Sequence, residues 1–330
     1  MKRRVVVIAM LGLLAAAYLV WHAGFAAVLS AVLRIGVAGF LVVCVYAIAV
    51  FALLGTAWWV LVAGSGARRW RSFVWARLVR DSAAETLPFS QIGGFVIGAR
   101  AAVLGGVPAN TAAASMIADI TTEFVAQLFY ASIGVIFLAM WLRRSAGMPS
   151  AGWLAIGIFL AAILAACFFL VQYYGRDRIR SFVTRFVPRA LDHTDAVTSS
   201  LQAIYRAQGR VAASLMLHLL SWIASGVGTC LTFRLMGAPV SLPAVVAVDS
   251  LIYAIRSIGF VVPNALGVQE AAYAALAPLL GIGPEIGLAI SLIKRGRDIA
   301  IGIPVLLFWQ ALEGHRAAAA AGSESQEKTA

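Results

Sequence analysis

The sequence predicts an all-α, polytopic integral membrane protein with about six to eight transmembrane helices and two re-entrant segments. Of its 330 residues, 62% are hydrophobic and only 12% are charged. Several apolar runs reach the roughly 20 residues that a helix needs to cross a bilayer. We expect residues 1–316 to form a single transmembrane domain and the polar, low-complexity residues 317–330 to form a disordered tail.

A pattern of Gly, Pro and Ser occurs twice and predicts an internal repeat. Residues 99–117 and 275–293 align at a constant offset of 176, with eight of nineteen positions identical. The most informative identities are Gly105/Gly281, Pro108/Pro284 and Ser115/Ser291. A proline-led apolar loop precedes each copy, so the related segments cover about 85–127 and 262–298. Transporters build binding sites from such broken helices.

The orientation of the two copies remains open at this stage. Loop charges place both copies entering from the same side, which would make them parallel repeats. One miscounted span would make them inverted instead. Broken backbone survives at membrane depth only inside protein or beside water, so we expect the copies to meet in the interior.

Composition excludes several classes of function. The net charge of +12 lies mostly in loops. This is typical of the basic cytoplasmic loops that orient membrane proteins, and we expect no nucleic-acid partner. The three cysteines lie in separate apolar runs and the four histidines are scattered, so neither a metal site nor a cofactor is expected. His218, inside a span, is expected to be a hydrogen-bonded packing residue.

The first third of the chain is predicted in four segments. Residues 5–20 follow three basic residues and favour an uncleaved first helix with its N-terminus inside. Residues 22–34 are amphipathic and are expected to lie along the outer surface. Residues 35–63 form a second span, and residues 64–80, with five arginines, are predicted to be a cytoplasmic segment.

The remaining elements follow from apolar runs and prolines. The predicted elements are a re-entrant segment at 87–106, spans at 108–141 and 153–174, a surface helix within 175–210, a helix pair at 211–236 and 244–262, and a last apolar region at 286–312. Pro108 suits the first turn of a helix because its missing N–H has no partner there.

Ionisable residues within or beside apolar runs are the best functional candidates, because each must face a partner or a wet cavity. Asp119, Glu123 and Gln127 are spaced four apart and form one polar stripe on a helix. Asp119 aligns with Arg295 in the second copy, so we hypothesise that the two pair across the repeat interface. Asp249 and Arg256 are expected to share a helix face.

Two interpretations of these charges remain open. They are either interhelical ion pairs or the lining of a polar groove that shelters a lipid head group. Short polar residues beside the proline loops suit a hydroxyl or an amine, or merely satisfy the loops' own amides. The candidate transport-pathway residues are Pro88, Ser90, Gln91, Arg100, Asp119, Glu123, Gln127, Asp249, Arg256, Pro263, Asn264, Gln269, Glu270, Arg295, Arg297 and Asp298. No catalytic residue is expected.

The same stretches carry a family resemblance. LPFSQIGGFVIGARAAVLGG, PNALGVQEAAYAAL, GIGPEIGLAISLIKRGRD and IGIPVLLFWQALE resemble the hopanoid-biosynthesis-associated membrane protein family HpnL. That family lies within the lysylphosphatidylglycerol-synthase transmembrane-region superfamily of flippase-like proteins. The resemblance covers most of the chain and is densest at 85–127 and 263–313.

The resemblance implies a multi-pass protein of the bacterial inner membrane that carries hopanoids toward the outer membrane. The implied partners are membrane lipids, with a hopanoid first and an anionic phospholipid second, together with other hopanoid-transport proteins. The alternatives are a non-transporting scaffold for lipid-synthesis enzymes and a membrane transferase. With no nucleotide-binding motif of the GxxxxGK[ST] kind, transport would use an ion gradient or a partner, with Asp119, Glu123 and Glu270 as proton carriers.

Overall fold

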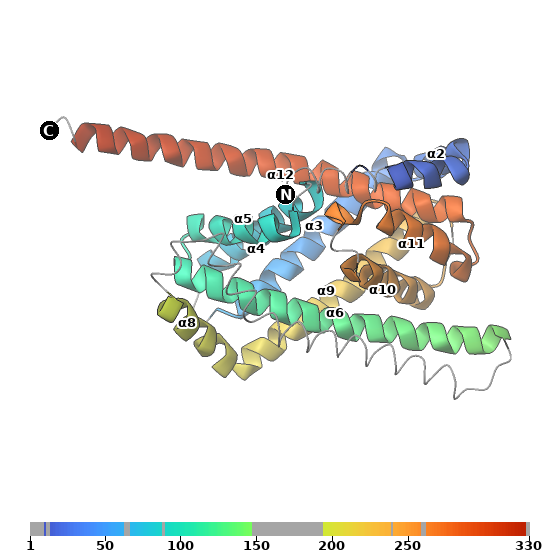
Figure 1. Cartoon of the computed structure of the whole chain (residues 1–330), viewed down its shortest axis with the longest axis horizontal. Helices are drawn as coiled ribbons and strands as arrows, with labels where there is room; N and C mark the ends of the chain where they lie inside the picture. Colours follow the sequence, from blue (N-terminus) through green and yellow to red (C-terminus); the bar gives the residue numbers. More distant parts are fainter. Residues whose placement is uncertain are drawn as a thin grey trace.

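The computed structural model describes residue 10 and residues 14–62, 67–87, 90–146, 194–238, 240–258 and 262–327. Its regular structure there is entirely helical (Figure 1). The predicted span at 153–174, most of the predicted surface helix at 175–210, and Pro88 lie outside these residues. The elements are α2 (Phe25–Leu33), α3 (Gly36–Val60), α4 (Ala67–Thr86), α5 (Ser90–Leu104), α6 (Ala109–Ala146), α8 (Thr194–Arg206), α9 (Gln208–Leu235), α10 (Leu242–Ile258), η3 (Pro263–Ala265), α11 (Val268–Leu276), η4 (Ala277–Leu280) and α12 (Pro284–Glu327).

Three helices are long and apolar enough to cross a membrane: Gly36–Val60, Ala109–Phe137 and Gln208–Leu235. A fourth span is possible by length if Leu14–His22 and Phe25–Leu33, which meet at a bend of 93°, count together. The described residues therefore form a multi-pass helical membrane protein, and the predicted number of about six to eight spans stays a prediction.

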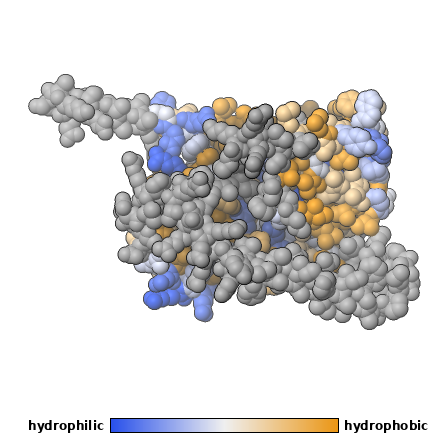
Figure 2. All heavy atoms as spheres, in the orientation of Figure 1, coloured by the Kyte–Doolittle hydropathy of each residue, from blue (hydrophilic) through white to orange (hydrophobic). Residues whose placement is uncertain are grey.

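Helix α3 shows how the apolar sequence is used. Val37, Leu41, Val45 and Ile48 lie on one face at helical spacing and are exposed. Such a stripe would be costly in water but is solvated by lipid tails. Figure 2 shows hydrophobic residues mainly over the right-hand part of one face of the molecule, with hydrophilic residues at its edges and near its middle.

The repeat extends well beyond the aligned residues. The offset of 176 places α3, α4, α5 and α6 on α9, α10, the α11–η4 pair and α12. In both copies a tight turn with a left-handed glycine precedes the long last helix, at Gly106 (φ 88°) and Gly281 (φ 71°). Glycine adopts this conformation without the steric cost that a Cβ brings. The two halves therefore have the same succession of helices.

The two repeats are inverted with respect to one another. Equivalent helices α3 and α9 pack against each other: Gly39 lies beside Leu235, and the Tyr46 hydroxyl donates to the carbonyl of Ala224 at 2.8 Å. These contacts join the start of α3 to the end of α9, so the helices are antiparallel. The equivalent pair α6 and α12 also runs in opposite directions (Figure 1). An axis perpendicular to the spanning helices therefore relates the repeats.

Each repeat has an apolar core of its own. The first contains Trp58, Phe73 and Val79, which pack with residues of α5 and α6. The second is built mainly from α9, α10, α11 and α12, with Phe233 and Ile290 among its buried residues. Within each repeat, two consecutive helices form an antiparallel hairpin, α4–α5 in the first and α10–α11 in the second. These hairpins cover the predicted re-entrant segments.

Helix α12 continues to Glu327, into the segment for which the sequence predicts a disordered tail. Residues 317–321 are five consecutive alanines, the strongest helix formers, and they continue the helix from the apolar region before them.

Candidate functional site

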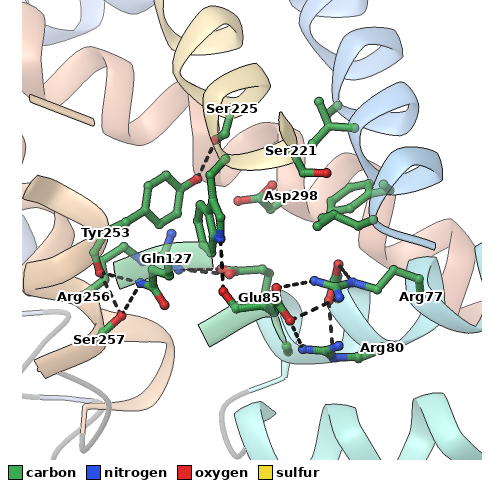
Figure 3. Close-up of a pocket in the computed structure, with 18 of the residues that line it drawn as sticks. Arg77, Arg80, Glu85, Gln127, Ser221, Ser225, Tyr253, Arg256, Ser257 and Asp298 are labelled. Atoms are coloured by element: carbon green, nitrogen blue, oxygen red, sulfur yellow. Dashed lines mark hydrogen bonds and ion pairs between the residues drawn. The ribbon is translucent and has the colours of Figure 1, made fainter. Parts of the chain in front are cut away.

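A cavity of about 370 Å³ lies between the two repeats (Figure 3). Helices α3, α4, α5 and α6 line it from the first repeat, and α9, α10, residues 262–265 and α12 line it from the second. Both hairpins reach it at their tips. The second proline loop lines the cavity through Val262, Asn264 and Ala265, whereas the side chains of residues 88–92 in the first loop lie outside the described residues.

The first wall of the cavity is an ion-pair cluster between α4 and α6. Arg80 binds Glu123 and Asp119 through its two terminal nitrogens, each at 2.7 Å. Arg77 also binds both carboxylates and pairs with Asp81 at 2.6 Å. Both arginine side chains are almost fully buried, so each must have these anionic partners.

This cluster corrects one prediction. Arg77 and Arg80, in the segment predicted to be cytoplasmic, are buried against the polar stripe of α6, and the side of the membrane on which they lie stays a prediction. Asp119 does not contact Arg295. Its carboxylate is fully buried and binds Arg77 and Arg80, while its Oδ1 lies 3.0 Å from Nε2 of His218 on α9. His218 is a buried, hydrogen-bonded residue, as expected.

The second wall is formed where the two hairpin tips meet. The Arg256 guanidinium on α10 binds the Glu85 carboxylate on α4 at 2.9 Å. The Asn264 side-chain amide donates to the backbone carbonyl of Glu85. Asn264 has a left-handed backbone (φ 51°), and its Oδ1 is buried with no donor among the described residues. Backbone strain and an unsatisfied acceptor together are typical of functional sites.

Neutral polar groups complete the lining. The Gln127 amide donates to the Ser257 hydroxyl at 2.6 Å, across the repeat interface. Ser225 and Tyr253 share a hydrogen bond of 3.0 Å between their hydroxyls. On α12, Arg297 and Asp298 form a pair at 2.6 Å and line the same cavity. Aromatic rings of both repeats, including Tyr46 and Trp222, also line the cavity.

Two further networks lie behind the second wall. Arg295 pairs with Glu270 and donates to the backbone carbonyls of Asn264 and Ala265. This bonding holds the left-handed loop in place. The Gln269 amide donates to the Ser291 hydroxyl at 2.9 Å.

In the other network, Lys294 Nζ lies 3.1 Å from Asp249 Oδ1. It also donates to the hydroxyls of Thr229 and Tyr273, at 3.1 and 2.8 Å. Neither Lys294 nor Asp249 lines the cavity.

The structure separates the predicted site residues into groups. Glu123, Gln127, Arg256, Asn264, Arg297 and Asp298 line the cavity. Asp119, Asp249, Pro263, Gln269, Glu270 and Arg295 are buried or partly buried in the layer around it. Asp249 and Arg256 share a helix but bind different partners. Arg100 pairs instead with Glu313 at 2.9 Å and is 57% exposed. The side chains of Ser90 and Gln91 lie outside the described residues.

Several cavity residues were missed from the sequence. They include Tyr46, Asp81, Glu85, Trp222 and Tyr253, besides the two buried arginines. A signal was present: Arg77, Asp81 and Glu85 are spaced four apart, like Asp119, Glu123 and Gln127. Two such stripes of opposite leading charge are expected to pair. Within the described residues, no group of His, Cys, Asp and Glu side chains is arranged to hold a metal ion.

Helices with exposed apolar faces that surround a charged interior cavity define a multi-pass membrane protein with a protected polar site. A family model described as the lysylphosphatidylglycerol synthase TM region matches residues 5–305. The chain belongs to this family. No curated protein and no solved structure matches the chain significantly.

Proposed function

We propose that the protein is a lipid transporter of flippase type in a bacterial inner membrane, with hopanoids as its cargo toward the outer membrane. The observation that carries the proposal is the charged cavity enclosed by two inverted repeats within an apolar helical protein. The lipid head group occupies this cavity while the apolar body stays among the exposed helix faces. Membership of a lipid-related membrane family supports the proposal.

The inverted arrangement supplies a route for alternating access. Transporters with inverted repeats expose a central site to either side by exchanging the arrangements of their two halves. Here the α4–α5 and α10–α11 hairpins act as re-entrant elements whose tips meet through Glu85 and Arg256. A head group crosses when this contact opens, so the pair acts as a gate between the repeats.

We propose that the protein moves the lipid without changing it chemically. If a pH gradient drives transport, charged groups in the interior of the protein must respond to it. Asp119, Glu123 and Glu270 are each bound by arginine. A pH gradient is therefore one condition of the test and not a premise.

The test is lipid exchange in liposomes that contain only the purified full-length protein. A hopanoid and a fluorescent phospholipid are followed between leaflets, with and without a pH gradient. Arg256→Gln should reduce exchange by about tenfold or more, because the hairpin tips can no longer close together over a head group and the partly exposed Glu85 carboxylate loses its cation. Arg100→Gln is the matched control, since it also breaks an Arg–Glu pair, but outside the cavity.

The outcomes separate the candidate functions. Exchange that depends on Arg256 and not on Arg100 supports transport. Absence of exchange with folded protein would contradict the proposal and favour the scaffold, and turnover of a lipid-linked substrate would favour the transferase. Equal loss in both variants would show that the cavity has no special role.

A further inference from the structure

The charged side chains of the cavity are already paired with one another, which limits the ligands it can hold. Its described lining contains four arginines and four carboxylates, so the formal charges cancel (Figure 3). They are Arg77, Arg80, Arg256 and Arg297, with Asp81, Glu85, Glu123 and Asp298. Each guanidinium forms an ion pair with a carboxylate. A phosphate that binds one of these arginines also meets the carboxylate already paired with it, so its negative charge is not matched by an excess cation of the described lining.

The residues behind the first wall of the cavity add no positive charge that would offset these carboxylates. Asp119 adds a further carboxylate there, in contact with His218. Its other oxygen already accepts from Arg77 and Arg80. Asp119 is fully buried, so it offers no surface to a ligand. A net anionic head group therefore meets no surplus cation among the described residues that line the cavity.

The ion pairs themselves retain accessible surface. The side chains of Arg256 and Glu85 are 12% and 25% exposed, and those of Arg297 and Asp298 are 18% and 11% exposed. Each pair thus presents a donor and an acceptor side by side. A hydroxyl group both donates and accepts, so neighbouring hydroxyls can bridge such a pair without adding charge.

Aromatic rings complete the match to an uncharged ligand. The T-shaped pair Trp222 and Tyr253, with centroids 4.8 Å apart, and Tyr46 bring rings of both repeats to the cavity. Rings of this kind pack against C–H surfaces and carry a polar group at one end. The Oδ1 of Asn264 still lacks a donor, which a ligand hydroxyl could supply after a small movement of the loop.

We infer that the cavity binds an uncharged, hydroxyl-rich head group of the polyol or sugar type and discriminates against head groups that carry a phosphate. The inference deepens the proposed function and rests on it for the lipid to which this head group is attached. It argues against an anionic phospholipid, the second lipid partner that the sequence analysis names, as the ligand of this cavity.

Binding is tested separately from transport by native mass spectrometry of the purified full-length protein in a non-ionic detergent. The probes are galactosyl diacylglycerol, phosphatidylglycerol and a diacyl lipid with a trimethylammonium head group, all with the same acyl chains and at equal concentration. The galactolipid should bind at least about tenfold more tightly than either charged lipid. Tighter binding of phosphatidylglycerol or of the cationic lipid would overturn the inference.

A change of one charge should switch this preference. Glu85→Gln removes the carboxylate partner of Arg256 and leaves the cavity with one surplus positive charge. The ratio of phosphatidylglycerol to galactolipid bound should rise by about tenfold. Glu313→Gln is the matched control, because it removes the partner of Arg100 outside the cavity and should leave the ratio unchanged. If Glu85→Gln fails to fold, Asp298→Asn creates the same surplus at Arg297.

An unchanged ratio in a folded cavity variant would overturn the inference. Preference for phosphatidylglycerol together with normal hopanoid exchange would refute it while leaving the proposed transport intact. Selective galactolipid binding without any exchange would support the inference about the head group and refute the proposed transport. Free galactose in about 100-fold excess separates the sources of the chemistry: retention of the lipid supports a lipid head group, and displacement would assign the site to a soluble sugar and contradict the lipid role.

Discussion

The two repeats share a helical plan but distribute their charges in opposite ways. In the first repeat, the hairpin helix α4 carries the cations and the long helix α6 carries the anions. In the second repeat, the hairpin carries Asp249 and Glu270, and the long helix α12 carries their partners Lys294 and Arg295. Each hairpin is thus bound by ion pairs to the long helix of its own repeat.

Contacts between the repeats are of a different kind. Many are neutral hydrogen bonds, such as Gln127 to Ser257 at 2.6 Å and Tyr46 to the carbonyl of Ala224 at 2.8 Å, and the Arg100–Glu313 pair between them lies at the surface. Glu85–Arg256 is an ion pair across the interface, and both of its side chains are partly exposed. From this difference we predict that each repeat moves as a unit and that motion occurs between them. The following predictions test that division, beginning with the largest effect.

Removal of Asp119 should destabilise the protein most. Asp119→Ala leaves Arg77 and Arg80 with fewer buried partners, and the free energy of unfolding should fall by about 3–5 kcal/mol. Thermal unfolding of the purified protein in detergent measures the loss. Exchanging the charges in the double variant Asp119→Arg with Arg295→Asp should not rescue stability, because the two side chains bind different partners. Rescue would mean that the repeats are joined by this pair.

Removal of Lys294 tests the second repeat. Lys294→Met leaves Asp249 buried without a cation and should cost about 3 kcal/mol. The neutral double variant Lys294→Met with Asp249→Asn should recover more than half of that loss, because no unpaired charge remains. A double-mutant cycle gives the coupling energy. Coupling near zero would contradict the idea that this pair binds the hairpin to α12.

The contact between the hairpin tips should matter least for stability. Glu85→Gln breaks a partly exposed pair, so unfolding should become easier by only about 1 kcal/mol, near the upper range for exposed ion pairs. Its unfolding curve is compared with that of Glu313→Gln, which breaks an exposed pair elsewhere. A loss as large as that of Asp119→Ala would show that the repeats are locked together, and the division into two moving units would fail.

The fold was more predictable than the site. Long apolar runs and the Gly–Pro–Ser pattern indicated a helical membrane protein with an internal repeat, because both signals are local in sequence. The sequence predicts the repeat at about 85–127 and 262–298 but not in α3 and α9, because these two helices share their apolar character with every other span. Its inverted orientation needed the three-dimensional contact of Gly39 with Leu235.

The pairing of charges could be predicted only in part. The stripe of Asp119, Glu123 and Gln127 follows from helix geometry, and the structure places its residues at or behind the cavity wall. Its partners did not follow, because sequence alignment equates Asp119 with Arg295 but says nothing of which helices touch. The burial of Arg77 and Arg80 did not follow from the sequence, because arginines outside apolar runs normally mark loops. Only packing of α4 shows that they are buried.

The antiparallel seam of α3 against α9 joins two helices that are equivalents of each other. Equivalent surfaces that meet across a two-fold axis are the arrangement of a homodimer. The seam therefore has the form of a subunit interface between two half-length chains, each inserted into the membrane in the orientation opposite to that of its twin. Fusion into one chain fixes both orientations permanently. It also frees each half to change its charges independently, which two copies of one gene product could never do.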